Sequence, residues 1–224
     1  MRGMPQTSPE SEYEKAREQM VAQQIARRGI SNPRVLDAMR RVPRHRFVPV
    51  ESQPHAYSDG PLPIGAAQTI SQPYIVAEMT ELLELRPTDS VLEVGVGSGY
   101  QTAILAELCS EVIGIERIPE LATNAADLLR DLGYQNVTIH IADGTQGYAE
   151  RAPYDAILVA AASPSLPEPL MAQLADQGRM IIPIGDQDEQ VLELVIRKGE
   201  SLHIYQLTPV RFVPLIGEYG NPQP

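Results

Sequence analysis

The chain has 224 residues, which is long enough to bury a substantial core and suits one large domain, or one domain with an arm. Its net charge of −11, from 18 basic and 29 acidic residues, disfavours a broad nucleic-acid-binding surface, because an acidic protein repels nucleic acid at long range. No stretch approaches the roughly 18–20 apolar residues that span a bilayer, and the first residues lack the apolar core of a signal peptide, so we expect a cytoplasmic protein with no membrane partner.

Cysteine and histidine usage argues against disulfides and metals. The single cysteine, Cys109, excludes an intramolecular disulfide and a thiolate metal cluster, and we expect it to be a small buried thiol. The four histidines are scattered without metal-ligand spacing. We therefore expect no metal.

The N-terminal part of the chain predicts a helical arm. Residues 1–11 are expected to form a loose tail, and residues 12–28 a helix with one apolar side. A second helix is predicted from Asn32, an N-cap before a first-turn proline, through Val42. Because each helix has only one narrow apolar face, we expect an arm rather than a separate domain.

Basic side chains gather around the end of this second helix, and two interpretations stay open. The group comprises Arg40, Arg41, Arg44, His45 and Arg46. Cations at a helix C-terminus are favoured by the macrodipole, which is the preferred explanation. The alternative is a basic patch that faces the substrate.

Residues 47–72 show no clear periodicity and are rich in proline and glycine. A loop of this length inside a compact domain is uncommon and is often functional. The next segment, residues 73–85, has apolar residues at helical spacing. We expect a single domain over residues 12–224, with the arm and loop in 12–72 and the core in 73–218.

From residue 90 onward strands and helices alternate, which predicts a parallel sheet covered on both faces. The predicted strands are 91–94, 111–116, 137–142, 155–160 and 180–184, followed by an antiparallel hairpin of 191–197 and 202–207. The predicted helices are 100–108, 119–132 and 168–175, with a short segment over 143–150. The fold class is therefore α/β, with a doubly wound, mostly parallel sheet of seven strands.

A glycine-rich turn follows the first of these strands. Gly95, Gly97 and Gly99 let the backbone turn sharply and approach a ligand closely. The helix after the turn directs its free N–H groups toward that ligand. Tyr100 stands where the dinucleotide pattern requires a third spaced glycine, which disfavours a dinucleotide.

Acidic residues lie at the strands beside this turn. Glu116 ends the second strand, where a carboxylate can accept hydrogen bonds from both ribose hydroxyls. Asp143 and Gly144 end the third strand and are placed to flank an adenine ring, while Glu93 lies within the first strand. The alternative is that these acids only mark strand ends beside helix N-termini.

These features together resemble the class I S-adenosylmethionine-dependent methyltransferases, which have a Rossmann-like fold. The resemblance rests on the compressed glycine spacing, Glu116, the pair Asp143-Gly144 and the closing hairpin. It implies that S-adenosyl-L-methionine is the cofactor and S-adenosyl-L-homocysteine its product.

The segments outside the glycine turn resemble one family more closely, the protein-L-isoaspartate O-methyltransferases. The segments that carry this resemblance are 42–44, 47–48, 62–65, 68–74, 81–83, 91–95, 97–103 and 212–215. It extends from about Glu12 to Gly217, and the stretch from Thr69 to Pro73 is specific. Tyr74 and Val76 stand near the positions where animal members carry histidines, so the chain resembles the bacterial branch.

The resemblance implies a repair reaction on damaged proteins and peptides. The enzyme esterifies the free α-carboxylate of an L-isoaspartyl residue, and the ester cyclises to a succinimide that can reopen as aspartate. A carboxylate is ionised at neutral pH because its reference pKa lies near 4, so no general base is required. Positioning is then the main task of the protein.

Ser71 is the residue that we expect to be catalytic, through a hydrogen bond that orients the substrate carboxylate. The alternative is that Ser71 only caps the helix that begins at Gln72 and Pro73. Backbone groups of residues 62–65 and 69–70 are expected to hold the main chain of the substrate. The alternative there is a rigid connecting loop.

The motifs and the resemblance together give two sets of candidate site residues. The expected cofactor-binding residues are Thr69, Ser71, Gln72, Glu93, Gly95, Gly97, Ser98, Gly99, Glu116, Asp143 and Gly144. The expected substrate-binding residues are Leu62, Pro63, Ile64, Gly65, Thr69, Ile70 and Ser71. We expect a monomer that acts on isoaspartyl proteins and peptides.

Three other functions are weighed against this one. A methyltransferase of another substrate class is disfavoured for nucleic acids by the acidic charge and by the missing Asn-Pro-Pro-Tyr-type motif. A nicotinamide-dependent oxidoreductase is disfavoured by Tyr100. A non-catalytic nucleoside-binding protein is disfavoured by the complete set of glycines and acids.

Overall fold

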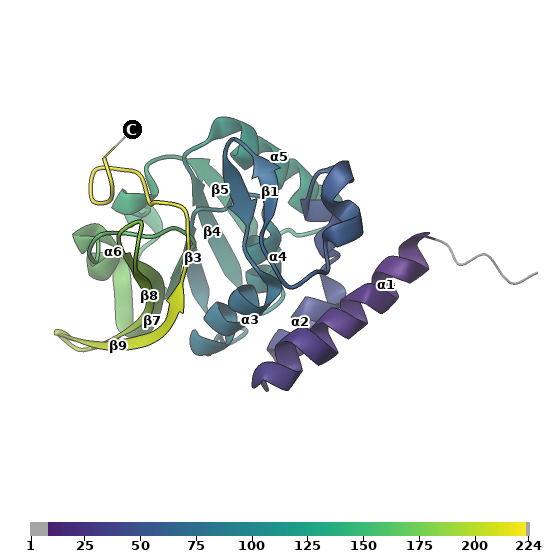
Figure 1. The fold of residues 1–224 in the computed structure, drawn as a ribbon. Coiled ribbons are helices and arrows are strands. Elements are labelled where there is room, and N and C mark those ends of the chain that lie inside the picture. The colour runs from purple at the N-terminus through teal and green to yellow at the C-terminus, as the bar shows by residue number, and fades with distance from the viewer. Residues whose placement is uncertain (1–8, 223–224) are drawn as a thin grey trace, which may run out of the picture.

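A computed structural model describes residues 9–222 and shows a seven-stranded sheet with helices against both of its faces (Figure 1). The strands are β3 (Ser90–Val94), β4 (Glu111–Glu116), β5 (Val137–Ile141), β6 (Tyr154–Val159), β7 (Leu174–Gly185), β8 (Gln190–Lys198) and β9 (Ser201–Val210). Their order in the sheet is β5-β4-β3-β6-β7-β8-β9. The first five pair in parallel, and β8 and β9 add antiparallel strands. The predicted fold class is confirmed.

Alternate side chains of the central strands enter two hydrophobic clusters, one on each face of the sheet. On β3, Val91 belongs to the cluster that includes the arm, α3 and α4, whereas Leu92 and Val94 belong to the cluster that includes α6. This burial on both sides explains why the parallel strands consist of nearly continuous apolar residues. The helices of the core are α3 (Pro73–Leu82), α4 (Tyr100–Ala106), α5 (Pro119–Asp131) and α6 (Glu168–Gln173). Among the described residues, no helix is both long and apolar enough to cross a membrane.

The arm consists of α1 (Pro9–Gln19), a π-helical segment (Met20–Ile25), a 3-10 turn (Ala26–Arg28) and α2 (Pro33–Arg41). The helix therefore begins at Pro9, so residues 9–11 are helical rather than part of a loose tail, and residues 1–8 of the expected tail lie outside the described residues. The N-cap prediction is confirmed, because the Asn32 side chain accepts a hydrogen bond from the N–H of Arg34. Apolar residues of the arm share one cluster with the sheet.

The predicted irregular loop contains a hairpin that the sequence did not indicate. After two short 3-10 helices (Arg44–Phe47 and Val50–His55), β1 (Leu62–Gly65) pairs antiparallel with β2 (Gln68–Ile70). The two turn residues, Ala66 and Ala67, have φ angles of 48° and 55°. A two-residue hairpin turn with both residues left-handed normally uses Asn or Gly, so two alanines gave no hairpin signal.

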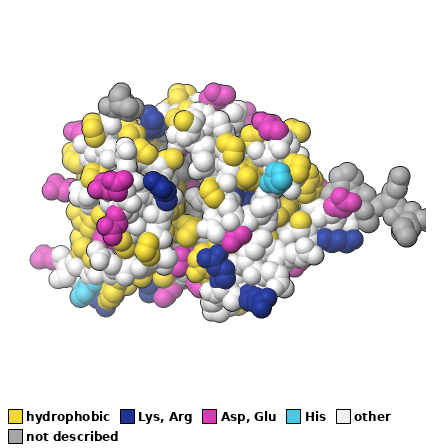
Figure 2. Space-filling view, viewed as in Figure 1, with side chains coloured by type: hydrophobic (Ala, Val, Ile, Leu, Met, Phe, Trp, Pro, Cys, Tyr) yellow, Lys and Arg dark blue, Asp and Glu magenta, His cyan; other side chains and the backbone are white. Residues whose placement is uncertain are grey.

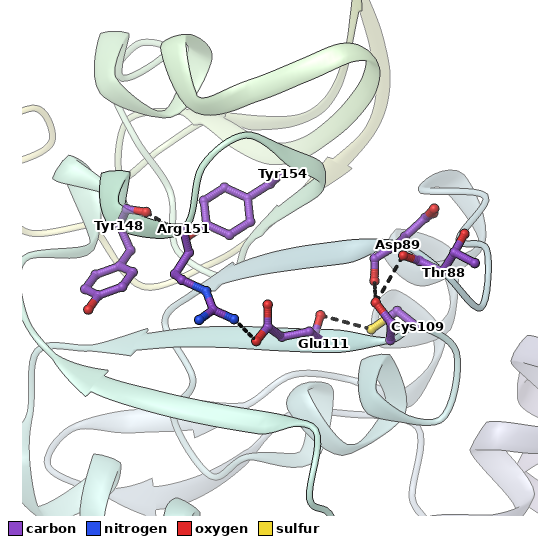
Figure 3. Close-up of polar contacts among 8 residues, drawn as sticks. Thr88, Asp89, Cys109, Glu111, Tyr148, Arg151 and Tyr154 are labelled. Atoms are coloured by element: carbon purple, nitrogen blue, oxygen red, sulfur yellow. Dashed lines mark hydrogen bonds and ion pairs between the residues drawn. The ribbon is translucent and has the colours of Figure 1, made fainter.

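The amino ends of the strands are joined by a network of polar contacts (Figure 3). Arg151 forms an ion pair with Glu111 at the start of β4, and the Tyr154 hydroxyl donates to the Tyr148 carbonyl at 2.7 Å. The Cys109 thiol donates to the Glu111 carbonyl at 3.4 Å, and burial raises the pKa of this thiol to about 12. The prediction of a small buried thiol is confirmed.

We predict that Ala67→Gly stabilises the protein. Left-handed backbone costs an alanine roughly 1–2 kcal/mol, and the greater freedom of unfolded glycine offsets part of the gain, which leaves about 0.5–1 kcal/mol in the free energy of unfolding. Ala126→Gly in the middle of α5 is the opposite control and should lower that free energy by about 1 kcal/mol. Urea titration measures both. Destabilisation of similar size in both variants would show that Ala67 is not left-handed in solution.

Candidate functional site

The glycine turn after β3 depends on glycine at three positions, all for their backbone conformation and two also for close packing. Gly95, Gly97 and Gly99 have φ angles of 88°, 56° and 86°, which L-residues with side chains rarely adopt. A Cβ atom on Gly99 would lie 3.2 Å from the Cβ of Ala125, so this glycine allows α5 to pack closely. A Cβ atom on Gly97 would lie 3.3 Å from Cδ1 of Ile64. The β1–β2 hairpin therefore folds directly over the turn.

Glu116 connects the turn to the end of β4. Its Oε2 accepts a hydrogen bond from the N–H of Gly97 at 2.9 Å, and its Oε1 accepts one from the N–H of Ile118 at 2.9 Å. The side chain is buried. Each carboxylate oxygen can accept more than one hydrogen bond, so both keep capacity for the hydroxyls of a ligand.

A cavity lies at the carboxyl ends of the strands, where α/β sheets bind ligands. It is lined by the hairpin, the glycine turn, the end of β4 and a C-terminal segment, residues 213–216. The predicted site residues in its wall are Thr69, Ile70, Ser71, Gly95, Gly97, Ser98, Glu116 and Gly144. The structure thus brings together most of the predicted cofactor-binding set.

Other predicted residues lie outside this wall. Residues 62–65 form β1, of which Ile64 covers the turn as described above. Gln72 lines a neighbouring cavity and donates from Nε2 to Oδ1 of Asp59 at 2.7 Å. Gly99 packs against α5. These residues therefore contact the elements that surround the first cavity without lining it.

Asp143 is occupied by contacts within the protein. Its Oδ1 accepts hydrogen bonds from the N–H and the hydroxyl of Thr145, at 2.9 and 2.7 Å, and its Oδ2 accepts one from the N–H of Glu218 at 2.8 Å. Burial by itself would raise the pKa of Asp143, but these donors hold it below its usual value. A Cβ atom on Gly217 would lie 2.0 Å from Oδ1. Asp143 therefore fastens the C-terminal segment beside the cavity.

Glu93 is fully buried and directly precedes Val94 and Gly95, which line the cavity. Neither of its carboxylate oxygens has a hydrogen-bond partner among residues 9–222, and neither has the hydroxyl of Thr102 beside it. Burial raises the pKa of Glu93 to about 8, the nearby Thr102 hydroxyl opposes this shift, and the negative charge of Glu116 adds to it. At neutral pH this carboxyl is therefore protonated, and its two unpaired oxygens keep hydrogen-bonding capacity beside the cavity wall, which fits a ligand with several polar groups such as S-adenosylmethionine.

Ser71 lies where this cavity meets a second one. The second cavity is lined by Pro61, Thr69, Ser71, Gln72, Ile75, Ala160, Pro209, Val210, Arg211, Phe212 and Val213. Thr69, Ser71, Ala160 and Val213 line both cavities. Within the described residues the Ser71 hydroxyl has no hydrogen-bond partner, and the N-cap of α3 is Gln72 without a side-chain cap. The structure does not support the interpretation of Ser71 as a cap.

The structure adds residues that the sequence analysis missed. Arg117 and Ile118 line the cavity directly after Glu116. Their position in the sequence, next to a predicted cofactor-binding residue, could have identified them. Tyr100 was noted only as a departure from the dinucleotide pattern, yet it lines the cavity. Residues 213–216 were part of the resemblance without an assigned role.

The basic group around the end of α2 includes two arginines in surface ion pairs and one buried arginine. Arg40 and Arg41 lie in the last turn of α2, as the preferred explanation predicts, and pair with Asp37 and Glu107. Arg44 is fully buried and lines neither cavity. It fits neither interpretation.

Comparison with known proteins gives the same family in sequence and structure. Residues 15–220 match the family model described as Protein-L-isoaspartate(D-aspartate) O-methyltransferase. The chain is 57% identical to a protein-L-isoaspartate O-methyltransferase of Methanospirillum hungatei, over 91% of this chain and 94% of the relative. It is 56% identical to one of Roseiflexus castenholzii, over 88% of this chain and 90% of the relative.

Two solved structures are similar over most of the chain. One is a protein-L-isoaspartate O-methyltransferase with a TM-score of 0.82 and 28% identity, covering 92% of this chain and 67% of that one. The other is a protein from Plasmodium falciparum, described as a putative protein-L-isoaspartate O-methyltransferase in complex with S-adenosyl-L-homocysteine. Its TM-score is 0.78 and its identity 29%, covering 89% of this chain and 98% of that one.

Glu93 predicts a specific pH dependence of stability. Its pKa is about 8 in the folded protein against an ordinary value of 4.5, so the folded state binds an extra proton between these pH values. The free energy of unfolding should therefore fall as pH rises from about 5 to 8, by on the order of 1 kcal/mol per pH unit from this group. Glu93→Gln removes this pH-dependent contribution. The difference in the free energy of unfolding between wild type and variant should therefore shrink or reverse as pH rises from about 5 to 8. A constant difference would show that Glu93 is ionised in the fold.

Proposed function

The chain belongs to the protein-L-isoaspartate(D-aspartate) O-methyltransferase family, and we infer that it methylates the free α-carboxylate of L-isoaspartyl residues in damaged proteins and peptides. The methyl donor is S-adenosyl-L-methionine. The ester starts repair, because it cyclises to a succinimide that can open as aspartate. The single observation that carries this conclusion is the match of residues 15–220 to the family.

We propose that the first cavity holds the cofactor. S-adenosylmethionine supplies a methyl group made electrophilic by its sulfonium charge. Backbone groups of Gly95 and Gly97, with Ser98, would hold it from the turn, and Glu116 would accept from its ribose hydroxyls. The unpaired carboxyl oxygens of Glu93 support this placement, since a buried carboxyl without a partner leaves hydrogen-bonding capacity beside the cavity wall.

The remaining predicted cofactor residues are proposed to act from the edges. Gly144 and Thr69 contribute to the wall, and Asp143 acts by fastening the C-terminal segment beside it. Gln72 acts from the second cavity, and Gly99 by seating α5.

We propose that Ser71 orients the attacking carboxylate. The substrate carboxylate is already ionised at neutral pH, so a positioned donor is of more use than a base. Ser71 offers such a donor, because its hydroxyl is not hydrogen-bonded within residues 9–222 and the residue lines both cavities. In this arrangement the substrate enters through the second cavity.

The hairpin is proposed to hold the main chain of the substrate. Among residues 9–222, β1 and β2 pair only with each other, so their outer edges keep backbone groups without a strand partner there, which suit an extended peptide. Recognition through residues 62–65 and 69–70 would then depend little on side chains. A repair enzyme needs this tolerance, because damage occurs in many sequences.

We further propose that residues 12–224 act as a single domain, as a cytoplasmic monomer without nucleic-acid or membrane partners. The cluster that joins the arm to the sheet supports one domain. The net charge of −11 and the acidic side chains spread over the face in Figure 2 disfavour nucleic acid. Analytical ultracentrifugation at micromolar concentration tests the oligomeric state, and we expect the mass of a single chain.

Methyl transfer to an isoaspartyl peptide tests the function directly. With labelled S-adenosylmethionine, we expect base-labile label on the isoaspartyl peptide and none on the matched aspartyl peptide. Base lability distinguishes an ester from an N-methyl group. Label on neither peptide, or on both equally, would contradict the assignment.

Ser71→Ala tests the proposed role of the hydroxyl. A hydrogen bond to a charged group contributes about 1.5–3 kcal/mol, so kcat/KM should fall roughly 10- to 150-fold. The melting temperature should stay within about 2 °C, because no cap is lost. Ser58→Ala, at an exposed serine of the same loop, is the matched control. Unchanged kcat/KM in Ser71→Ala would refute this role.

A further inference from the structure

Arg44 connects three segments around the site from inside the protein. Its Nε donates to the Ala56 carbonyl at 2.8 Å, and its Nη2 donates to the Ser71 carbonyl at 2.8 Å. Its guanidinium carbon lies 4.8 Å from the centre of the Tyr100 ring. Tyr100 begins α4 directly after the glycine turn and lines the cofactor cavity. Arg44 therefore contacts both the loop that ends at Ser71 and the helix that follows the turn.

The charge of Arg44 is costly in this position. The residue has no exposed surface, and within residues 9–222 no carboxylate pairs with it. Its Nη1 also has no hydrogen-bond partner among those residues. A buried charge that contacts only neutral carbonyls and one ring face contributes little to the stability of the fold. An apolar side chain of similar size often gives a more stable protein at such a buried position. This cost suggests that Arg44 serves the activity rather than the fold alone.

Ser71 is the contact through which Arg44 reaches the reaction. Arg44 lines neither cavity, so it does not touch the substrate or the cofactor site directly. The carbonyl that it holds belongs to the residue whose hydroxyl is free at the junction of the cavities. Fixing that carbonyl restricts the backbone rotation that would move the hydroxyl away.

We propose that Arg44 is a positioning residue for methyl transfer, which holds the Ser71 hydroxyl toward the substrate carboxylate through the Ser71 carbonyl. This proposal rests on the proposed role of Ser71. It predicts that the two residues act as one unit.

A double-mutant cycle tests this coupling. The variants are Arg44→Met, Ser71→Ala and the double variant, and the measurements are kcat, KM for the isoaspartyl peptide, calorimetric affinity for S-adenosyl-L-homocysteine and melting temperature. We expect Arg44→Met to lower kcat roughly tenfold, while KM and the product affinity change less than about threefold. In the Ser71→Ala background the same change should lower kcat less than about threefold.

Arg34 is the matched control. It also donates to two backbone carbonyls, those of Leu85 and Leu108, but neither of these residues lines a cavity, whereas Ser71 lines both. Arg34→Met should lower the melting temperature and leave kcat unchanged. If kcat fell as much in Arg34→Met as in Arg44→Met, the loss would be a general effect of removing an arginine that binds two backbone carbonyls.

The outcomes separate the two proposals. An equal loss of kcat from Arg44→Met with and without the Ser71 hydroxyl, or no loss at all, overturns the positioning role and leaves the proposed function intact. If Ser71→Ala has full activity, the role of Ser71 is wrong and the inference about Arg44 fails with it. If Arg44→Met does not fold, Arg44→Lys replaces it in the same cycle. Lysine keeps the positive charge but lacks the planar guanidinium group that reaches both carbonyls.

Discussion

The backbone after β3 passes through the left-handed region three times in five positions, and the arrangement of the site depends on this constraint. Without side chains on Gly95, Gly97 and Gly99, the turn can lie under Ile64 and against α5. The same turn places the N–H of Gly97 on Glu116, which fixes the end of β4 beside it. A side chain at any of these positions would strain the turn, and one at Gly97 or Gly99 would also press on a neighbouring side chain.

On the side of the second cavity, the short segment of Ser71 and Gln72 is held by contacts at both of its residues. From inside, Arg44 binds the carbonyl of Ser71. From outside, Gln72 binds Asp59, which also pairs with Arg28 of the arm at 3.2 Å. The Ser71 hydroxyl, which has no partner within residues 9–222, therefore lies on a segment that is fixed on both sides and lines both cavities. This arrangement suits a reaction that needs alignment more than acid–base chemistry.

The sequence was sufficient for features that follow from local patterns. The parallel strands were predicted to within a few residues at most ends, because buried strands carry nearly continuous apolar residues. The hairpin was missed because Ala66 and Ala67 adopt a turn that alanine disfavours. The contact of Asp143 with Glu218 joins residues 75 positions apart, which no local pattern indicates. Arg44 was assigned to a helix C-terminus or to a patch facing the substrate, and its burial was missed because charge normally predicts exposure.

The central claim is that the cofactor cavity and the substrate cavity meet at the Ser71 hydroxyl. The most direct measurement is a crystal structure of the enzyme with S-adenosyl-L-homocysteine and an isoaspartyl peptide. We predict that Oγ of Ser71 lies about 2.6–3.0 Å from an oxygen of the substrate α-carboxylate, with the peptide in the second cavity. A complex in which that carboxylate is held by other groups, more than about 4 Å from Ser71, would contradict the account.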